Sequence, residues 1–133
     1  MPPLILVIDD EEEMCRTLEK TLRQEGYEVI SETSWQEGLC RIKTRAVDLV
    51  LLDVSIPEMD FLTLLTHLQK TSVPLLIMTD HNTSLAALEA VQKGAYDCLN
   101  KPFSASSLKA AVKHALPSGF YPRSREHIYR YIP

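Results

Sequence analysis

Short aliphatic runs alternate along the chain with longer segments in which apolar residues recur every three or four positions. The short runs are typical of strands and the longer period indicates helices, so the pattern predicts five strand–helix units. The strands are expected at residues 4–9, 27–32, 48–53, 74–79 and 96–101. The helices are expected at residues 12–25, 35–44, 59–70, 84–93 and 105–116.

The first, third and fourth strands are expected to be buried on both faces, because their residues are almost all aliphatic, whereas strand 27–32 is expected to be half exposed. Local signals agree with the predicted ends. Ser34 and Glu37 have the spacing of a capping box, and Gly26 and Gly94 stand where helices should stop. Pro102 breaks the segment that follows the last strand.

A strand–helix alternation of this kind predicts an α/β fold with a doubly wound parallel sheet, since parallel strands need right-handed crossovers. All strands then end at one edge of the sheet, and open sheets bind ligands beyond those carboxyl ends. The residues that the chain supplies at this edge are Asp9, Asp10, Asp53, Thr79 and Lys101.

Length and composition narrow the function classes. The 133 residues, 45% hydrophobic and 24% charged, suit one compact domain with a real core. The net charge of −4 gives no general affinity for nucleic acid or anionic membrane. The apolar runs are too short to span a bilayer, and the start lacks a signal peptide, so a cytoplasmic location is expected. Cys15, Cys40 and Cys98 are expected to be free core thiols.

Five consecutive acids, residues 9–13, follow the first strand, and like charges repel. One interpretation is a solvated helix start, where acids favour the positive end of the helix dipole. The other is a site for a divalent cation. Asp9 and Asp10 are expected to face Asp53 across the crevice, and three carboxylates together need a cation or protons. Hard oxygen ligands suit Mg²⁺, which favours the second interpretation.

Four motifs, "VIDDEEE", "LVLLDVSIPEMD", "LLIMTDH" and "GAYDCLNKPF", stand in this order and together resemble the receiver domains of two-component response regulators. The resemblance covers about residues 4–116, and it is nearest to receivers of nitrogen-regulatory-class transcription activators. It implies a CheY-like, flavodoxin-like fold with strand order 2-1-3-4-5 and five helices on both faces. It also implies that Asp53 accepts a phosphoryl group from a histidine kinase, without the domain being an enzyme in the ordinary sense.

The resemblance assigns roles to the other residues of this edge. Asp9 and Asp10 match the acidic pair that holds Mg²⁺, completed by the acceptor aspartate and the backbone carbonyl of Ser55. Thr79 matches the hydroxyl that moves to the phosphoryl group, and Lys101 matches the cation that pairs with it. Such a shift implies a population change between two states that reshapes the surface of the fourth helix, fifth strand and fifth helix.

Plainer roles stay open for the same side chains. Asp9, Asp10 and Asp53 could cap helices or turns. Thr79 could be a buried strand residue, and Lys101 a surface lysine held extended by the following proline.

The sequence also departs from the family pattern. Asp80 replaces a small residue and adds a carboxylate at the crevice, and His81 lies close enough to influence water attack. Cys98 replaces an aromatic residue, although Tyr96 could lie on the same strand face. Phe61 stands where the family has a glycine that eases a tight turn. These differences put the mode and rate of switching in question.

Residues 1–117 are expected to form the receiver domain, and residues 118–133 a linker or C-terminal tail whose aromatic residues make contacts. The partners implied are a sensor histidine kinase or phosphotransfer protein and an output domain or partner protein. A second copy can dock through the fourth helix, fifth strand and fifth helix. No direct binding of nucleic acid or membrane is expected of this segment.

Alternatives to a working phosphoacceptor remain. A degenerate receiver could serve as a protein-binding module, which Asp80 favours. A phosphatase of the haloacid dehalogenase type also uses an aspartate nucleophile, but it needs a second aspartate where Ser55 stands. A nucleotide-binding flavodoxin-like protein is less favoured, since no glycine-rich loop follows the first strand.

Overall fold

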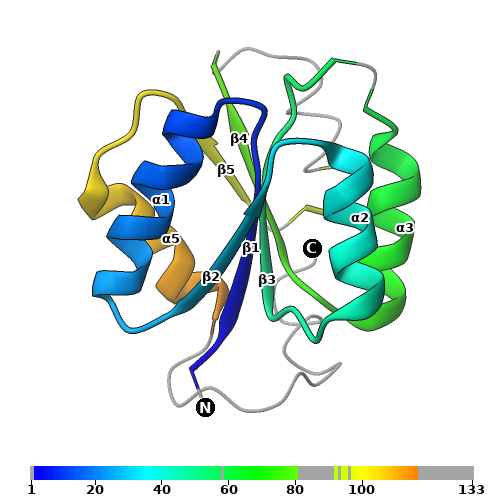
Figure 1. Ribbon diagram of the computed structural model, residues 1–133, viewed down its shortest axis with the longest axis horizontal. Coiled ribbons are helices and arrows are strands. Elements are labelled where there is room, and N and C mark those ends of the chain that lie inside the picture. The colour runs from blue at the N-terminus through cyan, green and yellow to red at the C-terminus, as the bar shows by residue number, and fades with distance from the viewer. Residues whose placement is uncertain (1, 58, 81–91, 93, 96, 117–133) are drawn as a thin grey trace.

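The computed structural model describes residues 2–57, 59–80, 92, 94–95 and 97–116. They contain a five-stranded parallel sheet in the order β2-β1-β3-β4-β5 (Figure 1). The strands are β1 (Leu4–Ile8), β2 (Glu28–Glu32), β3 (Leu49–Asp53), β4 (Leu75–Thr79) and β5 (Asp97–Asn100). The predicted fold class and strand order are therefore confirmed, with every strand at its expected place.

Helices cover both faces of the sheet: α1 and α5 lie on one side, and α2 and α3 on the other (Figure 1). Their bounds are α1 (Glu12–Gln24), α2 (Trp35–Thr44), α3 (Phe61–Thr71) and α5 (Ala105–Ala115). The helix expected at residues 84–93 lies largely outside the described residues. Within the described part of the chain, no helix is long and apolar enough to cross a membrane.

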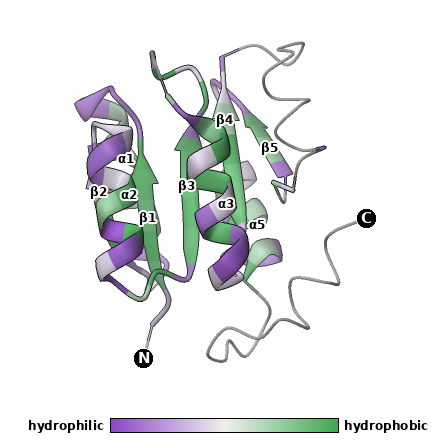
Figure 2. Ribbon diagram, turned by 90° about the vertical axis from the view of Figure 1, so that its right-hand side faces the viewer, coloured by the Kyte–Doolittle hydropathy of each residue, from purple (hydrophilic) through white to green (hydrophobic). Residues whose placement is uncertain are grey.

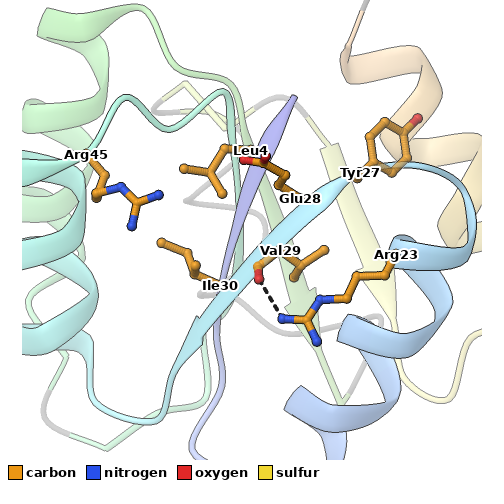
Figure 3. A pocket seen from close by; sticks show the side chains of 7 residues that line it. All are labelled: Leu4, Arg23, Tyr27, Glu28, Val29, Ile30 and Arg45. Carbon is orange, nitrogen blue, oxygen red and sulfur yellow. Dashed lines mark hydrogen bonds between the residues drawn. The ribbon is translucent and has the colours of Figure 1, made fainter. Parts of the chain in front are cut away.

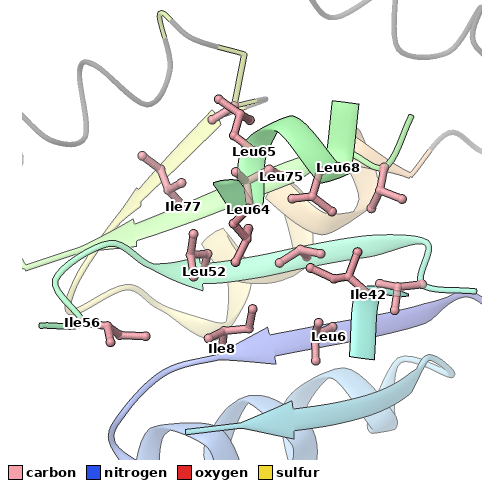
Figure 4. Close-up of a cluster of buried hydrophobic side chains, with 14 of the residues drawn as sticks. Leu6, Ile8, Ile42, Leu52, Ile56, Leu64, Leu65, Leu68, Leu75 and Ile77 are labelled. Carbon is pink, nitrogen blue, oxygen red and sulfur yellow. The ribbon is translucent and has the colours of Figure 1, made fainter. Parts of the chain in front are cut away.

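Two apolar layers hold the domain together, because strand side chains alternate between the faces of the sheet. The central strands are hydrophobic over most of their length and become polar near their carboxyl ends (Figure 2). Strands β1, β3 and β4 are buried along their whole length, as predicted, and the edge strand β2 is only partly buried. In the layer below α2 and α3, Ile42, Leu64 and Leu68 pack over strand residues that include Leu6 and Leu52 (Figure 4).

The ends of the helices follow local chemistry. Ser34 Oγ accepts a hydrogen bond from Glu37 N at 3.2 Å, which confirms the N-cap part of the predicted capping box. Gly26 has φ of 93°, a value that favours glycine, and it follows the end of α1, so this predicted helix stop is confirmed. Gly94 has φ of 127°, but the helix that it was expected to end lies largely outside the described residues. Gly38 is a different case: a Cβ there would run into the side chain of Ile8, so α2 needs a glycine to approach β1.

Helix α3 begins two residues after its predicted start because Asp60 caps it. Asp60 Oδ1 accepts from Thr63 N at 3.1 Å, and Asp60 Oδ2 accepts from Thr63 Oγ1 at 2.6 Å. Phe61 is then the first helical residue and packs against the layer below α2 and α3. Among the described residues, positive φ outside glycine occurs only at Ser72, so Phe61 adopts its turn without left-handed backbone.

The three cysteines are free, as expected, but they are not all in the core. Cys15 is buried and its thiol donates to the backbone oxygen of Asp9 at 3.3 Å, while Cys98 is partly buried. Cys40 is exposed, so its predicted core position is wrong. The buried residues of α2 include Gly38 and Ile42, and each lies two positions from Cys40, which puts Cys40 on the opposite side of the helix.

Candidate functional site

The alternation of side chains along the strands brings three charged residues to one face of the sheet, at the carboxyl ends of β1, β3 and β5. These are Asp9, Asp53 and Lys101. The residues two positions before them pack in the layer below α1 and α5; they are Val7, Leu51 and Leu99. Because side chains two apart share a face, the charged residues continue that apolar layer at the edge of the sheet.

Lys101 bridges the two buried carboxylates. Its Nζ lies 2.8 Å from Asp9 Oδ2 and 3.2 Å from Asp53 Oδ2, and 3.7 Å from Oε1 of the exposed Glu11. The side chain of Lys101 is 7% exposed and that of Asp9 is fully buried. Lys101 is therefore no surface lysine but the counter-ion of a buried acidic site.

The protonation of this pair follows from burial and charge. Burial acts to lower the pKa of Lys101, but the hydrogen bond to Asp9 and the charges of Asp53 and Asp9 outweigh it and raise that pKa above its ordinary value. Burial raises the pKa of Asp9, although hydrogen bonds from Lys101 and from the N–H of Glu11 act in the opposite direction. Lys101 thus stays charged, and any further positive charge at the site, such as a bound cation, would stabilise the buried carboxylates.

A third carboxylate completes the group. Asp9, Asp10 and Asp53 each offer an oxygen, and these atoms all lie within 4.8 Å of one another. Asp9 and Asp53 are buried, whereas Asp10 is exposed to solvent. The predicted meeting of these three residues is confirmed, and their hard oxygen donors with an open side make a group able to hold a metal ion.

Asp53 is also held by the turn that follows β3. Its Oδ1 accepts from Ser55 N at 2.9 Å and from Ser55 Oγ at 2.6 Å. Sequence reasoning used only the backbone carbonyl of Ser55 and missed this hydroxyl. The signal was present, since a serine two residues after an aspartate is typical of a turn closed by the aspartate side chain.

Thr79 ends β4 and is buried. By strand alternation its side chain belongs to the other face of the sheet, with Leu75 and Ile77 in the layer below α2 and α3. Its backbone oxygen accepts from Lys101 N at 2.7 Å, so the backbones of the two residues are joined.

Two of the residues that depart from the family pattern, Asp80 and Cys98, can be placed in the structure. Asp80 is exposed and lies outside the group formed by Asp9, Asp10 and Asp53. Cys98 packs in the layer below α2 and α3, and burial, then the charge of Asp97, raises the pKa of its thiol. His81 and Tyr96 lie outside the described residues.

A groove at the opposite edge of the sheet is separate from this site, because it lies where β1 and β2 begin. There Arg23 Nη2 donates to the backbone oxygen of Val29 at 2.9 Å (Figure 3). The groove is lined by Leu4, Arg23, Tyr27, Glu28, Val29, Ile30 and Arg45. Asp9, Asp10 and Asp53 form the only cluster of possible metal ligands found among the described residues.

Comparison with known proteins decides the family. Residues 5–113 match the model of the response regulator receiver domain. The chain belongs to this family. It is a receiver domain of two-component signalling, and hence a signalling phosphoacceptor, as the four motifs predicted. This membership sets aside the phosphatase and nucleotide-binding alternatives.

Several relatives of this receiver domain are transcriptional regulators. It is 38% identical over 114 residues to the transcriptional regulatory protein ZraR from Escherichia coli O157:H7, covering 84% of this chain and 26% of ZraR. The alkaline phosphatase synthesis transcriptional regulatory protein PhoP from Bacillus subtilis is 35% identical over 114 residues, covering 84% of this chain and 48% of PhoP. The chain thus spans about a quarter to a half of these proteins.

A solved structure agrees with the fold. NtrX from Brucella abortus is 32% identical, with a TM-score of 0.76, over 84% of this chain and 26% of NtrX. ZraR and NtrX belong to the nitrogen-regulatory class of activators, so the resemblance to that class is confirmed.

Proposed function

We propose that this receiver domain accepts a phosphoryl group on Asp53 from a histidine kinase or phosphotransfer protein, in a reaction that depends on Mg²⁺. The observation that carries the proposal is the meeting of Asp9, Asp10 and Asp53 with Lys101 at one edge of the sheet. Phosphoryl transfer needs alignment and charge neutralisation more than any other catalytic device, and this group offers both.

Mg²⁺ suits the donor set of the site. Asp9, Asp10, Asp53 and the backbone carbonyl of Ser55 would hold it, and the negative charge of three carboxylates exceeds what Lys101 alone offsets. When bound, the ion supplies positive charge against the oxygens of the transferred group.

In the transfer itself, an oxygen of Asp53 attacks the phosphorus atom. The new oxygen–phosphorus bond forms as the bond from phosphorus to the donor histidine nitrogen breaks, and the imidazole leaves with the electron pair and takes up a proton. Lys101, already charged and aimed at Asp53, then pairs with the phosphoryl oxygens.

The signal is proposed to pass through Thr79. Its hydroxyl starts on the other face of the sheet, so it reaches the phosphoryl group only if the end of β4 moves. The hydrogen bond from Lys101 N to Thr79 O couples that movement to the start of the segment after β5. The surface formed by β5, α5 and the helix expected at residues 84–93, where an output or a second copy would dock, changes as a result.

The rest of the protein is proposed by analogy with its relatives. Residues 1–117 form the receiver, and residues 118–133 a linker or tail. The chain spans only 26% of ZraR, a transcriptional regulatory protein, and this likeness supports an output domain or partner protein as the target of the signal.

The first prediction tests the acceptor. With Mg²⁺ and acetyl phosphate, intact mass should show one phosphoryl adduct, lost when Mg²⁺ is chelated and absent in Asp53→Asn. Asp48→Asn is the control, since this carboxylate lies outside the acidic group. Its Oδ2 accepts a hydrogen bond from Leu4 N at 2.8 Å, at the start of β1. No adduct on the wild type, even with beryllofluoride as a trapping analogue, would instead favour a degenerate receiver that works as a binding module, the alternative that Asp80 supports.

A further inference from the structure

The groove at the start of β1 and β2 has the chemistry of a site for an aromatic side chain. Its volume is about 400 Å³, within the range of pockets that hold ligands. Its apolar lining comes from Leu4, Val29 and Ile30, and the arginines Arg23 and Arg45 lie on either side of these residues (Figure 3). Apolar surface beside a guanidinium favours a flat ring, because the ring buries its area and stacks on the cation.

Arg23 is held in place for such a contact. Its Nη2 donates to the backbone oxygen of Val29 at 2.9 Å, and its Nη1 lies 3.4 Å from Glu19 Oε1. The side chain is nevertheless 56% exposed, so more than half of it can still be covered by a partner. A guanidinium that is already fixed loses little rotamer freedom on binding, which lowers the entropic cost of stacking.

The described part of the chain ends beside this groove. Both α1 and α5 end at the edge of the sheet where the strands begin (Figure 1). Leu116 is buried in the same apolar layer as Val29, and Tyr27 packs against that layer. Lys109 of α5 lies 3.5 Å from Glu25, which follows α1, so the two helices are in contact near their ends. The segment after Leu116 therefore starts close to the groove.

The sequence of that segment suits the groove. Pro117 restricts the residue before it to extended backbone, and Leu116 has φ of −104° and ψ of 106°. Gly119 permits a bend toward the sheet. Phe120 is the first aromatic residue after α5 and comes four residues after Leu116, so it can lie up to about 13 Å from it.

Charge favours this segment over a second copy of the chain as the occupant. The whole chain carries −4, and residues 117–133 carry +2 from three arginines and one glutamate, so residues 1–116 carry −6. A basic segment is attracted to an acidic domain. Two copies that met groove to groove would instead place Arg23 and Arg45 of one against the same residues of the other, because such an interface is self-complementary.

We propose that the groove binds the segment that follows α5 in the same chain, with Phe120 on the apolar lining and stacked against Arg23. The short tether makes this contact intramolecular, so a weak interaction is enough to keep it formed. The docked segment fixes the direction in which the chain leaves the receiver domain. This role is separate from phosphoryl transfer, since the groove lies at the opposite edge of the sheet from the acidic group.

NMR of the full chain, with labelled methyl groups, tests the contact directly. The ring protons of Phe120 should show nuclear Overhauser effects to the methyl groups of Leu4, Val29 and Ile30. Leu62 is the matched control, because its side chain is 55% exposed but lies in the first turn of α3, at the other edge of the sheet. A sample that mixes labelled and unlabelled copies separates contacts within one chain from contacts between two.

Trypsin cleavage after Arg123, followed by intact mass, measures how often the segment leaves the groove, because cleavage tracks the population of the open form. Phe120→Ala should be cleaved about tenfold faster than the wild type, the factor expected for a buried aromatic side chain. Tyr131→Ala, another aromatic of the same segment, should match the wild type.

A second pair of variants tests the stacked guanidinium. Arg23→Lys keeps the charge but loses the planar group, so cleavage should be about two- to fivefold faster than in the wild type. Arg16→Lys is the control, since Arg16 lies on the same helix, is 69% exposed and is not part of the groove. It should leave the rate unchanged.

Each outcome decides the proposal. Contacts of Phe120 with the three groove methyls within one chain, together with faster cleavage of Phe120→Ala and Arg23→Lys, support it. Contacts found only between copies would assign the groove to a second copy and overturn it. Absence of those contacts, or equal cleavage of Phe120→Ala and Tyr131→Ala, would also overturn it. Neither readout involves Asp53, so the phosphoacceptor function and this inference stand or fall separately.

Discussion

Lys101 is the residue that allows two carboxylates to be buried at the edge of this sheet. Burying an unpaired charge costs several kcal/mol, and Asp9 and Asp53 have side chains 0% and 3% exposed. Lys101 Nζ contacts both, so the two acids share one ammonium group. The same lysine thus stabilises the fold without a cation, and it is the residue proposed to pair with the phosphoryl group after transfer.

We therefore expect Lys101→Met to lower the free energy of unfolding by about 3–5 kcal/mol in buffer without divalent ions, because it leaves two buried acids unpaired. Urea unfolding measures the loss. Lys109→Met is the control: its partner Glu25 is 3.5 Å away and both side chains are 41% exposed, so it should cost less than about 1 kcal/mol. Equal losses in the two variants would contradict a buried role for Lys101.

At the scale of elements, the N-cap of α3 fixes how the chain leaves the phosphoacceptor strand. Two hydrogen bonds from Thr63 lower the pKa of Asp60 below its ordinary value of 3.8. A carboxylate with a lowered pKa stabilises the fold above its ordinary pKa, and that contribution is lost as the pH falls through the lower, folded value.

Asp60→Ala should lower the urea midpoint at pH 7, and the difference from the wild type should shrink as the pH falls below 3.8. Asp60→Asn is the control, because an asparagine still accepts at the N-cap but does not titrate. A difference between Asp60→Ala and the wild type that persists unchanged in strong acid would rule out the charged cap.

The elements also show what the sequence could predict and why. Short aliphatic runs that alternate with helical segments favour parallel strands buried on both faces. Such strands end at one edge of the sheet, so the meeting of Asp9, Asp10 and Asp53 could be predicted from the pattern. Contacts that depend on side-chain rotamers or on close packing could not be predicted from the pattern. The hydroxyl of Ser55 on Asp53 and the approach of Gly38 to Ile8 depend on distances that no periodicity encodes.

At the scale of the whole molecule, the sheet lies between two apolar layers, one below α1 and α5 and the other below α2 and α3. Polar residues of both layers meet at the carboxyl ends of the strands. The acids and Lys101 continue the layer below α1 and α5, and the side chain of Thr79 continues the other. A phosphoryl group on Asp53 that draws Thr79 toward it must therefore act across the sheet. This is how a change at one carboxylate could reach the helices on both faces.

Because the acidic group is assembled only in the folded chain, binding of a metal ion there should raise the free energy of unfolding. The three acids come from the ends of β1 and β3, far apart in sequence, so the unfolded chain has no comparable site, and Mg²⁺ should stabilise the folded state. At a hundredfold excess over its dissociation constant the gain is about 2.7 kcal/mol, measured as a shift of the urea midpoint. Asp10→Asn should remove most of this gain without harming the metal-free fold, because Asp10 is exposed. Glu13→Gln, which neutralises another exposed acid of the same run, should keep it. If the two variants responded alike to Mg²⁺, general screening of the acidic run, and not a site, would explain the effect.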